Sequence, residues 1–244
     1  MEKNQALHAY IKEDLLNRIK SGTYKVGDRI PTELELCKDF NVSRTTVRTA
    51  LKQLTIEGYL VRKQGNGTFV AEQKVKQTLS HTVKRYSDQI AVQGKKAEIS
   101  LVSLQVIPAT EFLVQVLNVS VNDPIQRIER IRKANGEPTQ FEIAYVPWKL
   151  APGITKEHAE TSLYETLQRN YHLQIAKTTE HVEIAFPDER VAHLLEYKEG
   201  LPCFYIETVA EAADGMVIEY SRSYFRGDKT NFVISRNYLE EEGL

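Results

Sequence analysis

The sequence predicts an α+β protein built from two domains. At 244 residues the chain is longer than most single domains. Its first part has the apolar spacing of three helices followed by a short hairpin, whereas the longer remainder alternates strand-like and helical segments. This mixture is typical of an α+β fold, in which helices cover a mixed sheet.

Charge divides the chain at about the same place. The formal net charge is −1, but residues 1–70 hold 12 Lys and Arg against 8 Asp and Glu, a net of +4. The rest holds 20 against 25, a net of −5. Phosphate binding needs a local basic face rather than a basic chain. The asymmetry therefore predicts different partners for the two domains.

The first two helices are expected before residue 41. One apolar face at helical spacing marks the first helix, which ends near residues 21–22; the face is formed by Leu7, Ile11, Leu15 and Ile19. In the second helix, Thr32 is a good N-cap and Glu35 a capping-box partner. That helix is expected to stop near Asn41.

The third helix combines an apolar stripe with a basic and hydroxyl face. Ser43 is its expected N-cap, and Gly58 its end. The stripe that should pack inward is Val47, Ala50, Leu51 and Leu54. The face that should point outward is Thr45, Arg48, Thr49 and Lys52, with Arg44 beside it in the first turn. Arginine can read guanine, and threonine can contact bases or the thymine methyl group, so this helix suits the major groove of DNA.

A glycine-rich hairpin follows this helix. Strands are expected at 60–63 and 68–70, around a turn in which Gly65 and Gly67 allow a close approach to a phosphate or the minor groove. Donors there are Arg62, Lys63 and Gln64. Taken alone, the charges of the third helix could be a solvated face. The complete order of elements instead predicts a winged helix-turn-helix.

The second domain is expected at residues 83–244, after a DNA-binding domain at 1–71 and a polar linker at 72–82. The predicted elements are a strand at 99–106, helices at 109–117, 163–170 and 189–197, and hairpin turns at Asn135-Gly136 and Asp214-Gly215. In the hairpin around residue 135, a loop with an odd number of residues would place Ile131, Phe141, Ile143 and Tyr145 on one face, and the apolar pattern favours this register.

The same register gathers charges on the other face of that hairpin. Arg130, Arg132 and Glu142 would share it, which suits an anionic, hydroxyl-rich ligand. The alternative is an exposed cross-strand salt bridge. The helix that opens at Thr161 and Ser162 could offer free N–H groups to a phosphate, although other capped helices look similar.

The stretches VSRTTVRTAL and EGYLVRKQGNGTFV resemble the DNA-binding domain of GntR-type bacterial transcription regulators. The resemblance covers about the first 70 residues. It differs at Leu34, where the family usually has arginine. The predicted DNA contacts, from this resemblance and from the residue pattern, are Thr32, Glu33, Ser43, Arg44, Thr45, Thr46, Arg48, Arg62, Gln64, Gly65 and Gly67.

From about residue 83 to 240 the chain resembles the effector-binding, UTRA-type domain of the HutC subgroup, through RIRKANGEP, SLYETL and IEYSRSYFRGD. The resemblance implies a chorismate-lyase-like fold, small ligands that are often sugar phosphates, and a homodimer. It also implies effector contacts at Tyr86, Ser87, Arg130, Arg132, Glu142, Ser162, Leu163, Tyr164, Glu219 and Tyr224. Sugar-phosphate sensors of this group often have tyrosine at the position of Phe225.

The sequence thus predicts a ligand-responsive regulator, a repressor that binds operator DNA as a dimer and is released by a small anionic effector. The alternatives are a sensor of amino-acid-like or other anionic metabolites, or an enzyme on the same fold. Against an enzyme, the sequence has no GxSxG, no HExxH and no paired metal-ligand spacing. No metal or cofactor is expected.

The start lacks an apolar signal core and no apolar run would span a bilayer, so we expect a cytoplasmic protein without a membrane partner. Cys37 and Cys203 are isolated, which fits a reducing compartment.

Overall fold

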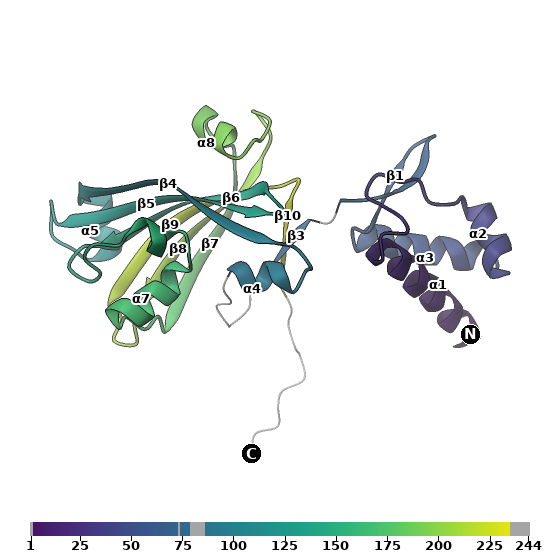
Figure 1. Ribbon diagram of the computed structural model, residues 1–244, viewed down its shortest axis with the longest axis horizontal. Coiled ribbons are helices and arrows are strands. Elements are labelled where there is room, and N and C mark those ends of the chain that lie inside the picture. The colour runs from purple at the N-terminus through teal and green to yellow at the C-terminus, as the bar shows by residue number, and fades with distance from the viewer. Residues whose placement is uncertain (1, 73, 79–85, 235–244) are drawn as a thin grey trace, which may run out of the picture. The chain divides into compact units, whose positions relative to one another are not determined.

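The computed structural model describes residues 2–72, 74–78 and 86–234. The chain forms two compact units, one up to Lys74 and one from Val75 onward. In the first unit three helices are followed by a hairpin. Figure 1 shows the second unit as a broad sheet with helices on both of its faces. The predicted α+β class, with a winged helix-turn-helix first, is confirmed.

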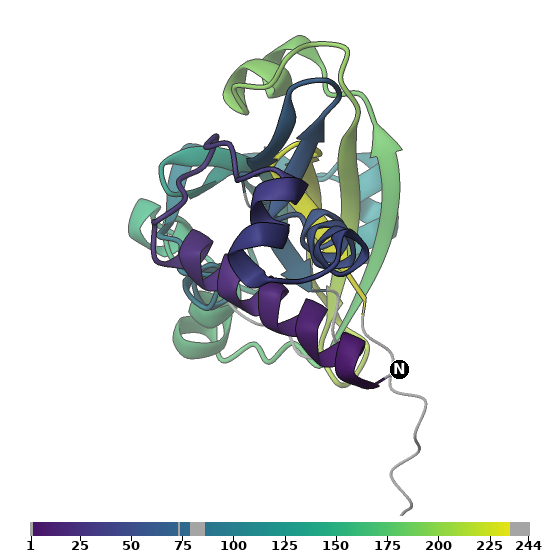
Figure 2. The same ribbon diagram turned by 90° about the vertical axis from the view of Figure 1, so that its right-hand side faces the viewer.

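The first unit contains three helices, α1 (Glu2–Lys20), α2 (Glu33–Phe40) and α3 (Arg44–Ile56), followed by strands β1 (Leu60–Lys63) and β2 (Gly67–Val70). The helices pack around one core (Figure 2), formed by Ile11, Leu15, Ile30, Leu36, Val47, Ala50, Leu51, Leu54, Leu60 and Val70. This core includes the whole predicted stripe of the third helix. Burying the stripe leaves the opposite face of α3 to solvent.

The caps predicted for α2 and α3 are present. The Thr32 hydroxyl accepts a bond from the Glu35 N–H, and the Glu35 carboxylate accepts one from the Thr32 N–H. Asn41 ends α2 in the left-handed conformation, and the Ser43 side chain accepts from the Thr46 N–H at the start of α3. These bonds satisfy backbone groups that a helix end leaves free, so they fix the tight turn between the two helices.

The second unit is built on a six-stranded sheet with the order β4-β5-β6-β9-β8-β7. Its strands are β4 (Ala97–Pro108), β5 (Pro124–Ala134), β6 (Glu137–Pro147), β7 (Lys177–Ala185), β8 (Cys203–Glu211) and β9 (Val217–Arg226). Two short strands, β3 (Val75–Thr78) and β10 (Thr230–Val233), form a separate parallel pair. The helices are α4 (Tyr86–Ala91), α5 (Glu111–Leu117), α6 (Lys156–Ala159), α7 (Leu163–Tyr171) and α8 (Glu189–Leu194).

Helices cover both faces of this sheet. On one face, α6 and α7 pack over Ile128 and Ala144, while α4 packs at the other end near Ala134. On the second face, α5 packs near Tyr145 and α8 packs over Phe141. On the first face, no helix of the described residues covers the strands between α7 and α4.

A β-bulge sets the register of the hairpin between β5 and β6. The two-residue Asn135-Gly136 turn by itself would place Arg130 opposite Phe141. The bulge inserts Thr139 without a partner, and beyond it Arg130 faces Glu142. The predicted division of this hairpin into an apolar face and a charged face is therefore confirmed.

Part of the predicted linker is a strand instead. Residues 75–78 form β3, whose register pairs Gln77 with Phe232 of β10. This segment gave no core pattern in the sequence, because it is only four residues long and one of its buried side chains, Gln77, is polar. Residues 79–82 of the predicted linker lie outside the described residues. The helix expected over 189–197 ends earlier, at Leu194.

Candidate functional sites

Four of the eleven residues expected to contact DNA are exposed at the start of α3 and on its outward face. Ser43, Arg44, Thr45 and Arg48 are exposed. Thr46 is different, because only 6% of its surface is accessible and its hydroxyl lies 2.8 Å from that of Ser43. It lies one turn before buried Ala50, beside the apolar stripe. Its side chain therefore supports the helix cap and does not face outward with the others.

One predicted DNA contact of the wing binds another predicted contact in the second helix. Arg62 Nη2 of β1 lies 2.6 Å from Glu33 Oε1, in the first turn of α2. This ion pair links the wing to the second helix. The Thr32 hydroxyl, also predicted to contact DNA, donates to Glu35 Oε2 at 2.8 Å in the capping box. Leu34, which stands where the family has arginine, is 56% exposed.

The wing turn is exposed at Gln64 and Gly65 and needs glycine at position 67. Gly67 has a φ of +113°, which side chains other than glycine rarely adopt. A Cβ added there would also lie 2.7 Å from Arg29 Nε. Arg29 pairs with Phe69 through an isolated β-bridge, so its guanidinium lies against the wing. Sequence reasoning missed Arg29, because nothing in its local pattern places it beside a turn almost 40 residues away.

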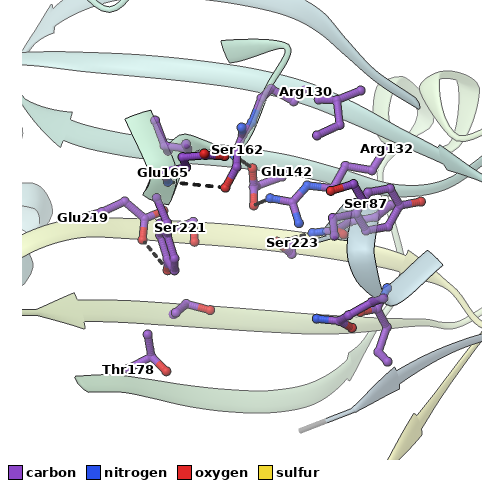
Figure 3. Close-up of a pocket in the computed structure, with 18 of the residues that line it drawn as sticks. Ser87, Arg130, Arg132, Glu142, Ser162, Glu165, Thr178, Glu219, Ser221 and Ser223 are labelled. Atoms are coloured by element: carbon purple, nitrogen blue, oxygen red, sulfur yellow. Dashed lines mark hydrogen bonds and ion pairs between the residues drawn. The ribbon is translucent and has the colours of Figure 1, made fainter. Parts of the chain in front are cut away.

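The uncovered stretch of sheet in the second unit forms the floor of a cavity of about 660 Å³. Figure 3 shows its polar side chains, which come from several strands and from helix ends. The cavity brings together nine of the ten predicted effector contacts, namely Tyr86, Ser87, Arg130, Arg132, Glu142, Ser162, Leu163, Tyr164 and Glu219. Its volume lies in the range of ordinary small-molecule sites.

Two arginines and one glutamate form the charged centre of the cavity. The Glu142 carboxylate accepts from Arg130 Nη2, and its other oxygen accepts from Arg132 Nη2 at 2.7 Å. Arg130 is 1% exposed and Glu142 6%. Burial alone would raise the pKa of Glu142, but the two guanidinium groups outweigh it and hold that pKa below its ordinary value. The three groups carry a net charge of +1.

The arginines retain hydrogen-bonding capacity beyond this triad. Among the residues that the structure describes, Arg130 Nε and Arg132 Nε are buried and have no acceptor. Buried donors without partners are uncommon in folded proteins. An anion in the cavity would supply both the missing acceptors and the missing negative charge.

A second carboxyl group lies deep in the same cavity. Glu219 of β9 is 1% exposed, and the Tyr164 hydroxyl donates to its Oε2 at 3.2 Å. Burial, followed by the nearby charge of Glu142, raises the pKa of Glu219 to about 8. Glu219 is therefore largely protonated at neutral pH. It can donate a hydrogen bond as well as accept one, as hydroxyl groups of a ligand require.

The ends of two helices complete the walls. At α7, the Ser162 side chain caps the helix by accepting from the Glu165 N–H, and the first turn opens onto the cavity. At α4, the Tyr86 ring lies under Arg132, with the guanidinium carbon 5.4 Å from the ring centroid. The Tyr86 hydroxyl lies 3.0 Å from that of Thr139. Tyr86 thus holds Arg132 in place, while Ser87 is exposed at the wall.

Tyr224, the tenth predicted effector contact, does not line the cavity. Side chains alternate along β9, so Phe225 lines the cavity and Tyr224 points to the opposite face. There its ring packs against Tyr205 and Phe141. The cavity also has polar side chains that sequence reasoning missed: Thr178, Glu180, Thr208, Ser221 and Ser223. The alternation of Glu219, Ser221 and Ser223 along one strand could have indicated from the sequence that this face of the strand is polar.

In the described part of the chain, no group of His, Cys, Asp and Glu is arranged to hold a metal ion. No helix within that part is long and apolar enough to cross a membrane.

Comparison with known proteins identifies both units. Residues 7–70 match the model of the bacterial regulatory proteins of the gntR family, and residues 92–231, more than half of the chain, match the UTRA domain. The HTH-type transcriptional repressor NagR of Bacillus subtilis is 30% identical, covering 93% of each chain. The mannosyl-D-glycerate transport/metabolism system repressor MngR of Escherichia coli is 29% identical, covering 95% of this chain and 96% of its own.

The structural comparison agrees. The crystal structure of PhnF from Mycobacterium smegmatis superposes with a TM-score of 0.82 at 31% identity, covering 96% of this chain and all of that one. The two units are thus a GntR-type DNA-binding domain and a UTRA domain. The chain belongs to the GntR family of bacterial regulators, as a DNA-binding transcriptional repressor and not an enzyme.

Proposed function

We propose that this repressor binds a palindromic operator as a homodimer and is released when a sugar phosphate enters the cavity of the UTRA domain. Two copies of α3, related by two-fold symmetry, would read two half-sites. The effector would favour a dimer geometry in which the two helices no longer match the spacing of the half-sites.

The observation that carries the effector proposal is the pair of arginines in the cavity, of which Arg130 is buried and Arg132 is partly buried. Arg130 and Arg132 share a single carboxylate, and the Nε atom of each has no acceptor. A phosphoryl group has enough oxygens to accept from both guanidinium groups and from the first turn of α7. The hydroxyl groups of a sugar would meet Glu219, the serines of β9 and Tyr164.

The names of similar repressors favour a sugar-derived ligand. MngR is named for mannosyl-D-glycerate, and other similar repressors are named for fructoselysine utilization. A carboxylate would also satisfy the two arginines, so an amino-acid-like or other anionic metabolite is the second candidate.

The effector proposal is tested by a thermal-shift screen of the full chain. The panel contains inorganic phosphate, glucose 6-phosphate, glucose, citrate and an amino acid such as glutamate. Ligands that bind only the folded state raise its stability, so glucose 6-phosphate should raise the melting temperature more than glucose or inorganic phosphate does. A panel in which only carboxylates stabilise the protein would favour the second candidate.

The division of roles is tested by two variants in a gel-shift assay with upstream DNA. Arg44→Ala should weaken operator binding and leave effector binding intact, because Arg44 is exposed on α3. Arg132→Ala should leave operator binding intact and prevent release by the effector. Normal release in the Arg132→Ala variant would mean that the cavity is not the effector site.

The dimer is tested by sedimentation of the protein with operator DNA. We expect two chains per operator and loss of tight binding when one half-site is scrambled. One chain bound with full affinity to a single half-site would refute this part of the proposal.

A further inference from the structure

Part of the cavity wall comes from β3, outside the main sheet. Gln77 lies on β3, the strand that begins directly after the DNA-binding unit ends at Lys74. Only 9% of its surface is exposed, and within the described residues its amide nitrogen Nε2 has no hydrogen-bond acceptor. Gln77 therefore resembles Arg130 and Arg132 in presenting a buried donor without a partner in the same cavity.

Packing places Gln77 at the Arg132 end of this cavity. Its neighbour on β3, Val75, belongs to the same core cluster as Tyr86 and Ile99. The Tyr86 ring lies under the Arg132 guanidinium, and Ile99 is the register partner of Arg132. The β3 strand is thus held against the part of the wall that carries the second arginine.

Contacts on the β10 side of Gln77 also place it at the Arg132 end of the cavity. Its register partner on β10 is Phe232, whose ring packs against Phe225 of β9 at a centroid distance of 5.0 Å. Phe225 is paired with Gln140 of β6, which is in turn the partner of Arg132 on β5. All of these side chains line the cavity.

We infer that Gln77 is a further effector-binding residue, whose amide donates to an acceptor oxygen of the ligand at the Arg132 end of the cavity. A buried amide donor that lacks an acceptor lowers the stability of the ligand-free protein, since its lost hydration is not compensated. An oxygen of the effector removes this penalty on binding. The contact also attaches the effector to the strand that directly follows the DNA-binding unit.

The inference rests on the proposed function, because it assumes that the cavity binds a sugar phosphate. The test uses the full chain, with glucose 6-phosphate as the probe. Gln77→Met keeps the length of the side chain and removes the donor. Lys76→Met is the matched control, since Lys76 is exposed on the same strand. Calorimetry gives the dissociation constant of the probe, and thermal unfolding without ligand gives the stability of each variant.

We expect Gln77→Met to weaken glucose 6-phosphate binding about tenfold, the effect of one hydrogen bond of ordinary strength. Lys76→Met should leave the dissociation constant unchanged. Without ligand, Gln77→Met should melt at or above the temperature of the wild type, because a penalty has been removed.

Two results would overturn the inference. One is binding by Gln77→Met within twofold of the wild type, which would leave the proposed function standing. The other is a ligand-free Gln77→Met that melts several degrees below the wild type, which would show that the amide has a structural partner. A wild-type protein that does not bind the probe would overturn the proposed effector, and the inference with it.

Discussion

Replacing Glu142 by alanine tests whether the cavity is built around buried, mutually compensating charges. Glu142 accepts bonds from both Arg130 and Arg132, and Arg130 is 1% exposed. Glu142→Ala would leave two guanidinium groups close together, one fully buried, without a counter-charge. Removal of one partner from a buried ion pair typically costs about 3 to 5 kcal/mol, because the remaining charge is uncompensated.

The expected loss can be expressed as a melting temperature. The UTRA unit runs from Val75 to Leu244. For a domain of about that size, each kcal/mol shifts the melting temperature by about 2 to 4 °C. Glu142→Ala should therefore melt on the order of 10 °C below the wild type. Glu142→Gln retains an oxygen acceptor, so its melting temperature should lie between those of the wild type and Glu142→Ala.

Calorimetric and urea-induced unfolding provide the assay. Arg169→Ala is the control, because it removes an exposed ion pair with Glu165, in which Arg169 is 69% exposed. Exposed pairs contribute at most about 1 kcal/mol. Inorganic phosphate should raise the melting temperature of Glu142→Ala more than that of the wild type, since it supplies the missing negative charge. If the melting temperature of Glu142→Ala falls no further than that of Arg169→Ala, the two arginines are not held by a buried counter-charge and the reasoning fails.

Two further predictions concern pH and the wing. Burial raises the pKa of Glu219 to about 8, so the stability that this group contributes is fully present below its unfolded pKa, about 4.5, and is lost as pH rises to about 8. In urea titrations, Glu219→Gln should therefore gain stability relative to the wild type as pH rises from 5 to 8. A difference in stability that stays constant over this range would contradict the assignment. Gly67→Ala combines an unfavourable φ of +113° with a 2.7 Å approach to Arg29 Nε, whereas a Cβ at Gly65 (φ +77°) meets nothing within 4 Å. In gel shifts Gly67→Ala should weaken operator binding more than Gly65→Ala does, and equal losses would mean that Arg29 does not matter at the wing.

Local sequence patterns predicted much of the fold because the interactions concerned are local. The capping box of Thr32 and Glu35 needs only two residues three positions apart, and the stripe of α3 needs only helical periodicity. The Asn135-Gly136 turn predicted the hairpin, and the apolar alternation of its strands predicted the register that brings Arg130 and Glu142 together. Because each of these signals lies within a few residues or one hairpin, no knowledge of the rest of the chain was needed.

The tertiary structure decided which side chains share a surface when they come from distant parts of the chain. It placed Phe225 in the cavity and Tyr224 outside it, because pairing across β6, β9 and β8 fixes the orientation of the strand. It also turned the middle of the predicted linker into β3, since parallel pairing with β10 satisfies the backbone of a segment that shows no pattern of its own. Gln77 therefore reached the cavity through a contact between residues more than 150 positions apart, which local sequence patterns do not record.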